Sequence, residues 1–298
     1  MDPVTHALSG MVFRQLGFRG KAALFVLVFS AVAPDFDYIT RLWGAAAFLK
    51  YHRGITHGVV ALGVFPLAMG FLFRKSGGFF YNASLSFLGY SSHLLLDLTN
   101  QYGTRILAPL DGNRYSLDLT FIIDPYITLG LLLAVLLGKV SRRRPALIAA
   151  CALLSITFYL GGKYYMQGEA RQFLKTKMDA HTYKVYPLPN GFFRWWFVVR
   201  SGDEVTTGFV DLFLKKACVH EKYRVHPVDP AAIESKKSRV VQRFLAFAGT
   251  PHAEVKRGAG KTVVTWRELS YSFLPGERFV AEVVMDAKGE IIRAEFRM

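Results

Sequence analysis

A histidine and an aspartate, four residues apart, stand near the end of a long apolar segment. They belong to the stretch HLLLDLTNQYG at residues 93–103, and the preceding residues from Phe79 to Tyr90 are apolar enough to lie in a lipid bilayer. Ionisable residues are costly in such a segment and tend to mark a functional site. Residues four apart share one face of a helix, so His93 and Asp97 can converge on one metal ion. The alternative is an intrahelical hydrogen bond without a metal.

Three further motifs contain residue types that bind metals. PDFD at residues 34–37 places two carboxylates just after an apolar run, where the chain can bend both toward one centre, although one of them could instead cap a helix. HRGITH at residues 52–57 contains two histidines five apart, a spacing that a regular helix does not aim at one ion, so His52 is expected in the preceding loop. SLDLTFIIDP at residues 116–125 adds two aspartates, one of which could be only a helix cap. The candidate ligands are His6, Asp35, Asp37, His52, His57, His93, Asp97, Asp118 and Asp124.

Histidines and aspartates without thiolates are the ligand set of hydrolytic zinc, manganese or iron, not of a structural zinc knot. The two cysteines, Cys151 and Cys218, are too far apart in the sequence to suggest a thiolate site. The candidates outnumber the ligands of one tetrahedral ion, which predicts two or three ions, with zinc favoured over manganese or iron. Such ions activate water and stabilise a transferring phosphoryl group. Asp35 is the candidate general base, and Arg53 or Arg114 is suited to hold a phosphoryl oxygen.

The elements that must position these residues are apolar helices. The chain has 298 residues, of which 52% are hydrophobic, and its mean hydropathy is +0.24. Four apolar runs approach the roughly 20 residues that cross a bilayer, and a short hairpin of two helices precedes them. Asp2 and Pro3 are expected to start the first helix, and Pro34 to end the second. The six predicted helices cover Pro3–Leu16, Ala22–Ala33, Ile55–Phe73, Phe79–Leu98, Leu119–Gly138 and Pro145–Gly162.

The charges are distributed unequally between the two ends of these helices. With six spans, one side receives only basic residues, which are Arg14, Arg19, Lys21, Arg74, Lys75, Lys139, Arg142, Arg143 and Arg144. The positive-inside rule makes that side cytoplasmic. All the aspartates and histidines of residues 1–162 fall at or near the opposite side. The sequence therefore predicts a multi-pass protein of the bacterial inner membrane with an extracytoplasmic site. The N-terminus is interpreted as mature sequence without a signal peptide.

After Gly162 the sequence becomes mixed in charge and alternates in the manner of strands. Strands are predicted in FFRWWFVVR, EVTTGFVDLFL, KTVVTWREL, RFVAEVVMD and EIIRAEFRM, and helices over residues 163–177 and 235–248. The predicted organisation is a transmembrane helical catalytic domain at 1–162 and a soluble extracytoplasmic α+β domain with an antiparallel sheet at 163–298. Much of the net charge of +15 lies in the second domain, which we expect to meet anionic lipid head groups and not nucleic acid.

Five motifs in order, MDPVTHALSG, APDFD, HRGITHG, HLLLDLTNQYGT and LDLTFIIDP, resemble those of bacterial membrane-bound metal-dependent hydrolases, some described as LexA-regulated inner-membrane proteins. The match covers about residues 1–130. A more distant similarity is to zinc-dependent phospholipase C and related fungal nucleases, helical enzymes with three zinc ions. That similarity matches His6 to an early helical ligand, Asp37 and His52 to an Asp and His fifteen residues apart, and His93 with Asp97 to an HxxxD pair. It implies that Asp97 bridges two ions.

The sequence departs from those distant relatives in two respects. They use a free N-terminal amine as a ligand, whereas Met1 and Asp2 precede the helix here. Their later HxxxE or HxxxD ligands have no counterpart, because no histidine lies between His93 and His181. Asp118 or Asp124 and His57 would have to replace these ligands, or one metal site is lost.

These observations favour a membrane-embedded, metal-dependent hydrolase that cleaves a phosphoester of a phospholipid or lipid-linked phosphate. A metal or ion transporter is one alternative, but it needs polar residues through the whole depth of the membrane, and the cytoplasmic half of each predicted span is apolar. A membrane-anchored binding module with a vestigial site is another. Its working part would be the soluble domain, whose aromatic strand contains Trp195 and Trp196, at least one of them in the core. The oligomeric state stays open.

Overall fold

The computed structural model describes residues 1–141, 143–224 and 229–297, and the predicted cytoplasmic residue Arg142 lies outside them. The chain folds into two compact units, each with its own internal packing. The helical unit comprises Met1–Tyr38, His52–Met166 and Pro187–Phe192. The sheet unit comprises Ile39–Tyr51, Gln167–Tyr186 and the described residues from Phe193 onward.

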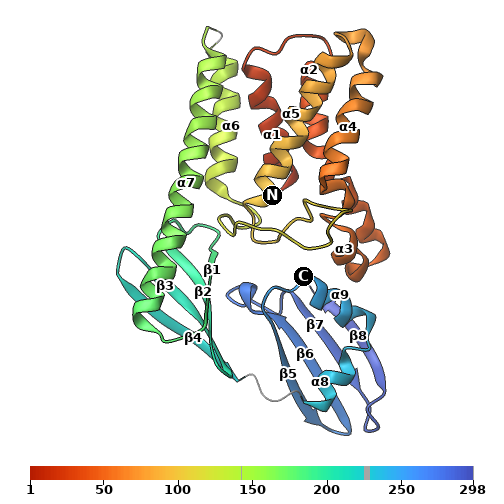
Figure 1. Ribbon diagram of the computed structural model, residues 1–298, viewed down its shortest axis with the longest axis vertical. Helices are drawn as coiled ribbons and strands as arrows, with labels where there is room; N and C mark the ends of the chain where they lie inside the picture. Colours follow the sequence, from red (N-terminus) through yellow and green to blue (C-terminus); the bar gives the residue numbers. More distant parts are fainter. Residues whose placement is uncertain (142, 225–228, 298) are drawn as a thin grey trace. The chain divides into compact units, whose positions relative to one another are not determined.

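Helices lying alongside one another form the helical unit (Figure 1). They are α1 (Pro3–Gln15), α2 (Ala23–Val32), α4 (Val59–Leu72), α5 (Phe79–Leu98), α6 (Pro125–Val140) and α7 (Pro145–Lys177), with the 3-10 segments η1 (Ala33–Trp43), η2 (Ile55–His57) and η3 (Arg74–Ser76). The last helix, α7, continues without interruption through Gly162, where the predicted domain boundary lies, and the units divide between Met166 and Gln167.

Aspartates followed by proline start two of these helices. Asp2 accepts hydrogen bonds from the backbone N–H groups of Val4 and Thr5 at 3.1 and 3.0 Å, and Pro3 is the first residue of α1. This confirms the predicted cap. Asp124 caps α6 in the same way, with Pro125 at the first position. The aspartate oxygen accepts from helical N–H groups that have no partner within the helix. Proline is tolerated at the first helical position because an N–H there would form no hydrogen bond within the helix.

Small residues allow α5 to pack closely against its neighbours. A Cβ atom added to Gly89 of α5 would lie 2.5 Å from the carbonyl oxygen of Leu27 in α2, and one added to Gly10 of α1 would lie 2.8 Å from the Cα atom of Val28. Buried hydroxyls also meet between these three helices. Ser30 of α2 donates to Ser86 of α5 at 2.8 Å, and the hydroxyl of Ser9 in α1 lies 3.1 Å from that of Ser92 in α5. Close backbone approach at small residues, aided by hydroxyl pairs, is typical of packing between membrane helices.

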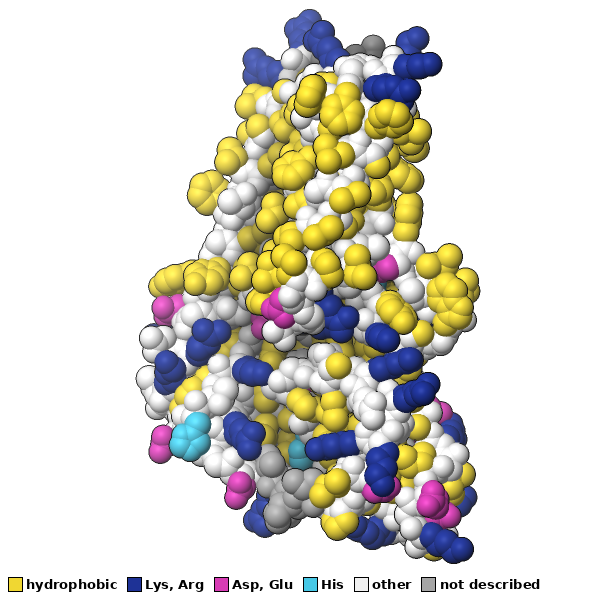
Figure 2. Space-filling model, turned by 45° about the vertical axis from the view of Figure 1, so that its right-hand side comes forward, with side chains coloured by type: hydrophobic (Ala, Val, Ile, Leu, Met, Phe, Trp, Pro, Cys, Tyr) yellow, Lys and Arg dark blue, Asp and Glu magenta, His cyan; other side chains and the backbone are white. Residues whose placement is uncertain are grey.

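Two helical stretches of the described chain are long and apolar enough to cross a membrane, Ala23–Trp43 and Pro145–Lys177. A third is available if Ala45–His57 and Val59–Leu72, bent by 62°, count as one span. The six predicted spans are not confirmed, because α1 has 13 residues and α6 has 16, each short of a bilayer crossing. Hydrophobic side chains cover much of the visible face of the helical unit, and Lys and Arg side chains gather at the end where α1–α2, α4–α5 and α6–α7 connect (Figures 1 and 2).

The sheet unit contains two antiparallel four-stranded sheets, where the sequence predicted one. The first sheet has the order β1 (Thr182–Pro187), β2 (Arg194–Ser201), β3 (Glu204–Asp211) and β4 (Lys216–Arg224). The second has the order β5 (Pro251–Gly258), β6 (Lys261–Glu268), β7 (Val280–Met285) and β8 (Ile291–Arg297). Strands β1, β4 and β5 escaped prediction because polar or exposed residues interrupt their apolar alternation, as β4 shows with mostly exposed side chains.

Short helices complete the sheet unit. They are α3 (Ala45–Tyr51), α8 (Pro230–Ser235) and α9 (Arg239–Phe247), and α9 packs on β7, β8 and α3. The single helix predicted over residues 235–248 was wrong, because the chain breaks after Ser235 and Ser238 caps a new helix at the N–H of Val240. Trp195 and Trp196 are both fully buried, and the Trp196 indole donates to the Leu269 carbonyl at 2.9 Å, which joins the two sheets.

Candidate metal centre

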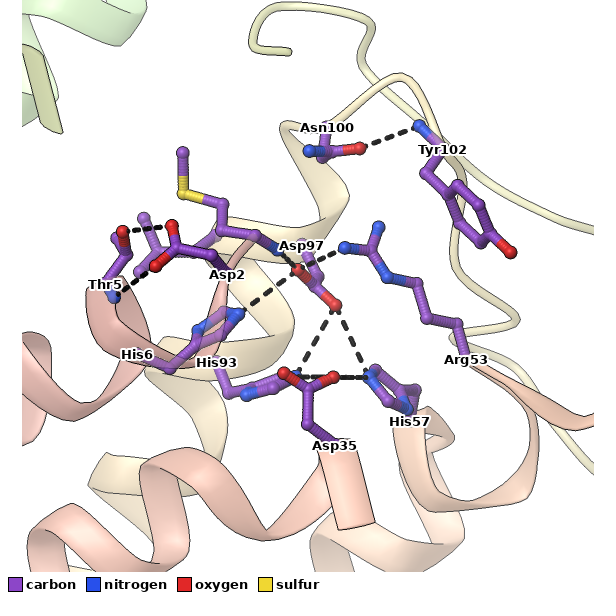
Figure 3. A network of polar contacts seen from close by, with 12 residues as sticks. Asp2, Thr5, His6, Asp35, Arg53, His57, His93, Asp97, Asn100 and Tyr102 are labelled. Atoms are coloured by element: carbon purple, nitrogen blue, oxygen red, sulfur yellow. Dashed lines mark hydrogen bonds and ion pairs between the residues drawn. The ribbon is translucent and has the colours of Figure 1, made fainter. Parts of the chain in front are cut away.

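Four segments of the helical unit bring the candidate ligands together (Figure 3). His93 and Asp97 share one face of α5, as predicted, with His93 Nε2 3.4 Å from Asp97 Oδ2. The carboxylates of PDFD lie on the 3-10 segment η1, where Pro34 has no N–H to continue the hydrogen bonds of α2. Arg53 and His57 lie in and after the turn that follows α3, and His6 lies in α1.

A backbone carbonyl orients the imidazole of His93. Its Nδ1 lies 2.7 Å from the carbonyl oxygen of Ala31. Because a carbonyl can only accept, Nδ1 carries the proton, and the lone pair of Nε2 faces the centre. That Nε2 atom lies 3.1 Å from Nε2 of His57. Hydrogen bonds of this kind hold metal-binding histidines in the correct tautomer.

A carboxylate orients the imidazole of His57 in a similar way. Its Nδ1 lies 3.3 Å from Asp37 Oδ2. Its Nε2 faces the centre, 3.5 Å from Asp35 Oδ1 and 3.4 Å from Asp97 Oδ2. Both histidines therefore present Nε2 to the same small volume, with Nδ1 turned toward an acceptor.

The spacing of this tetrad, Asp35, His57, His93 and Asp97, fits one tetrahedral ion. Ligands about 2.0–2.1 Å from a tetrahedral zinc ion lie about 3.3 Å from one another. The separations given above, together with 3.8 Å between His93 Nε2 and Asp35 Oδ1, run from 3.1 to 3.8 Å. Both oxygens of Asp35 and Oδ2 of Asp97 are buried and accept no hydrogen bond from the described residues. Buried carboxylate oxygens need compensation, and a cation would provide it.

The other oxygen of Asp97 faces a second set of groups. Arg53 Nη2 donates to Oδ1 at 2.9 Å, the α-amino group of Met1 forms an ion pair with the same atom, and His6 Nε2 lies 3.4 Å away. The His6 ring is stacked on that of His93, with centroids 3.6 Å apart. Both ring nitrogens of His6 are buried and have no hydrogen-bond partner in the described part of the chain. Arg53 and the Met1 amino group therefore already compensate Oδ1 of Asp97, and His6 keeps ring nitrogens available for a further ligand beside the tetrad.

The predicted pair Asp37 and His52 lies beside the tetrad. Together with Asp35, which also belongs to the tetrad, this pair forms a further group that could hold a metal. Asp37 Oδ1 lies 2.7 Å from His52 Nδ1. Its Oδ2 accepts from the Arg53 N–H and the Thr56 hydroxyl, both at 2.9 Å. These protein groups already compensate the Asp37 carboxylate, so its contacts suit a group that positions His57 better than they suit a direct ligand.

The two predicted arginines differ in their surroundings. Arg53 has a left-handed backbone with φ of 55°, and it brings its guanidinium to Asp97. Arg114 contacts backbone, donating to the carbonyls of Gly103 and His52 at 3.1 Å each. Both guanidinium groups lie over the Tyr102 ring, 5.1 and 5.4 Å from its centroid. Burial raises the pKa of the Tyr102 phenol, which keeps it neutral between them.

Two predicted ligands are not brought to the centre. Asp124 caps α6 and accepts a hydrogen bond from the Tyr159 hydroxyl at 2.9 Å. Asp118 accepts from the Ser116 hydroxyl at 2.7 Å in a turn. Neither belongs to the groups that could hold a metal among the described residues. Sequence reasoning assigned no role to the Met1 amino group, Thr56 or Tyr102, although Thr56 and Tyr102 lie inside HRGITH and HLLLDLTNQYG and the distant relatives use an N-terminal amine.

Comparisons with known proteins agree with a membrane location. The family model described as YdjM inner membrane protein matches residues 1–170. An uncharacterized protein of Bacillus subtilis (strain 168), YfhP, is 24% identical over 209 residues, which make up 66% of this chain and 64% of that relative. The chain thus spans about 64% of the length of the curated relative it matches. No solved structure matches. These findings support the resemblance to the inner-membrane family and give no support to the one with phospholipase C or nucleases.

The tetrad can be tested by the metal content of the purified full chain. We expect His93→Ala to lower the metal content measured by elemental analysis by at least one ion per chain, because the substitution deletes a nitrogen facing three other candidate ligands. Asp118→Asn is the matched control and should keep the wild-type content, since that residue lies outside the cluster. Equal metal content in wild type and His93→Ala, with both chains folded, would contradict the site.

Proposed function

Since the chain belongs to the YdjM inner membrane protein family, we propose that it is a membrane-embedded, metal-dependent hydrolase of phosphoesters. The observation that carries the proposal is the buried tetrad of two histidines and two aspartates with a guanidinium beside it. The chemistry supplied by divalent ions in such a centre is a lowered pKa of bound water and stabilisation of charge on a phosphoryl group. Zinc suits this set of donors, and manganese or iron are alternatives.

Two ions are proposed. Asp35, His57, His93 and Asp97 would hold the first, and His6 together with Asp97 would hold the second. The alternative is a second ion at Asp37 and His52. We favour His6 because it has no hydrogen-bond partner among the described residues, whereas Asp37 and His52 bond each other.

The side chains around the ions have separate roles in the proposal. Asp35 presents a second carboxylate oxygen that accepts no hydrogen bond from the described residues, and this oxygen would accept the proton of the attacking water. Arg53 would hold a phosphoryl oxygen. Its guanidinium lies next to Asp97, where it would stabilise the negative charge that develops on the phosphoryl group. Arg114 is assigned to positioning, since it fixes the backbone of the loops around Tyr102.

A phosphate carried by a membrane lipid is the proposed substrate. Large apolar side chains near the ligand motifs are exposed, with Phe36 at 53%, Ile55 at 69% and Leu110 at 81% of their maximum. Apolar surface of this kind is stable against lipid and costly against water. A lipid head group could therefore reach the centre from the bilayer without its acyl chains entering water.

The proposed topology is a multi-pass protein of the inner membrane, with the metal centre and the sheet unit on the extracytoplasmic side. The helix connections rich in Lys and Arg lie at one end of the helical unit (Figures 1 and 2). The positive-inside rule assigns that end to the cytoplasm, and the N-terminal ends of α1 and α6 lie at the other end.

Metal transport is a second candidate, favoured by polar side chains inside the helical unit. The hydroxyl pairs Ser9–Ser92 and Ser30–Ser86 are buried, so the interior is less apolar than the sequence suggested. However, the single proton of the Ser9 or Ser92 hydroxyl can be donated to a carbonyl of its own helix instead, which is how serine commonly packs between membrane helices. Hydrolysis therefore remains the leading proposal, ahead of transport and of a binding module with a vestigial centre.

The second ion is tested by the stoichiometry of the His6→Ala variant. We expect two ions per wild-type chain and one in His6→Ala, because the tetrad stays intact. His52→Ala should retain two, although with weaker affinity, since that residue helps to position Asp37. Two ions in His6→Ala and one in His52→Ala would place the second ion at the other group.

Hydrolysis is tested with the full chain in nanodiscs that contain phosphatidic acid or phosphatidylglycerol. We expect the wild type to release phosphate or phosphoglycerol. The rate of release should fall about 100-fold or more for Arg53→Ala, because a donor to the transition state is lost. Asp97→Asn should show no detectable release. Asp118→Asn should stay within twofold of wild type. A metal-loaded wild type that releases nothing from either lipid, yet moves metal into proteoliposomes, would favour transport.

Topology is tested with the two native cysteines, both of which are exposed on the surface of the protein. A membrane-impermeant maleimide added to intact spheroplasts should label Cys218 on β4, because the proposal puts that strand outside. Cys151 on α7 should react only after the membrane is dissolved, since lipid surrounds it. Labelling of Cys218 only in lysed spheroplasts would reverse the orientation.

A further inference from the structure

The sheet unit contains a cavity that shares no residue with the metal centre. Its volume is about 760 Å³, within the range of about 300–1,000 Å³ that holds small ligands. Strands of both sheets line it, together with the start of α8 and the residue after that helix. Val198 and Arg200 come from β2, Val255 from β5 and Trp266 from β6.

Contacts between the two sheets define the cavity. Trp196, Val198 and Arg200 alternate along β2 and so share one face of the first sheet. On that face the Trp196 indole donates to the Leu269 carbonyl. From the neighbouring strand β1, Lys184 Nζ donates to the Gly249 carbonyl at 2.8 Å, just before β5. These hydrogen bonds hold the sheets together next to a space that the side chains leave open.

Part of the cavity wall is apolar. Val198 is 4% and Trp266 is 7% exposed. The Trp266 N–H donates to the Ser235 hydroxyl at 2.9 Å, so the polar edge of the indole is satisfied within the protein. Val255, which pairs with Val264, extends this wall along the second sheet. Such a surface favours a hydrocarbon or aromatic group over water.

The charged side chains of the cavity are mostly basic. Lys184, Arg200, Arg224 and Lys236 line it. Among its described lining residues the acidic one is Asp229, and Arg257 neutralises that carboxylate through contacts of 2.6 and 2.8 Å. Lysine has three N–H donors, and Lys184 uses one of them on Gly249 in the described contacts. The excess of positive charge favours an anionic ligand.

We propose that this cavity binds an anionic amphiphile, with its carboxylate or phosphate held by Lys184 and Arg200 and its apolar chain lying on Val198, Val255 and Trp266. Charge complementarity selects the head group, and the apolar wall selects a ligand with a hydrocarbon chain over a simple anion. The site is independent of the metal centre and of the hydrolysis proposed there.

A pair of photoreactive probes tests the proposal on the full chain in nanodiscs of zwitterionic lipid. One probe is a diazirine fatty acid and the other is the matching neutral fatty alcohol. After illumination, peptide mass spectrometry should place the acid on β2, β5 or β6, with at least fivefold less labelling by the alcohol. The double variant Lys184→Gln, Arg200→Gln should lose at least fivefold of the acid labelling because the two cations that hold the head group are removed.

Lys222→Gln is the matched control, because it removes a cation from the same sheet at a side chain 59% exposed that does not line the cavity. It should label as the wild type does, and near-ultraviolet circular dichroism should show that all variants are folded. Inorganic phosphate at millimolar concentration should leave most of the labelling in place. Complete displacement by phosphate would identify a simple anion site and overturn the proposal. Equal labelling by acid and alcohol, or labelling confined to the helical unit, would overturn it as well.

Discussion

The carboxylate of Asp97 is fully buried among helices of a membrane protein, and the surrounding structure must compensate its charge. A buried carboxylate without partners costs several kcal/mol or more. Here Arg53, the Met1 amino group and three histidines surround its two oxygens. Helix α5 brings Asp97 into the bundle, and the partners arrive from α1 and from the segment between α3 and α4. The arrangement of the helical unit therefore follows from bringing compensating groups to one carboxylate.

The same constraint explains the positions of the neighbouring groups. Asp35 would repel Asp97 if both stayed ionised without a cation between them, yet His57 Nε2 and His93 Nε2 lie near both carboxylates. Asp37 avoids this conflict because hydrogen-bond donors surround it. Aspartates two residues apart on η1 thus have different environments. The oxygens of Asp35 accept no hydrogen bond from the described residues, whereas Asp37 holds an imidazole in place.

The sequence predicts which side chains lie together within one helix, but it does not predict which side chains from distant segments come into contact. A separation of four places His93 and Asp97 on one face of any helix, and Asp2 before Pro3 indicates a cap in any context. Asp118 and Asp124 are the same residue type near the same motifs, but their partners, Ser116 and Tyr159, become known only when the loops and helices are placed. The second sheet was missed for a similar reason, because exposed strands such as β4 are defined by their hydrogen-bonded neighbours and not by an apolar pattern.

The close approach of α5 to α2 at Gly89 has a consequence for biosynthesis. A segment carrying His93 and Asp97 partitions poorly into lipid by itself, because ionisable side chains are costly within a bilayer. The ribosome makes α1, α2, η1 and the Arg53 turn before α5. The Ala31 carbonyl that orients His93 and the Arg53 side chain that neutralises Asp97 are therefore synthesised before the helix that needs them. The order of the motifs along the chain thus means that the partners of the polar face of α5 exist before α5 itself is made.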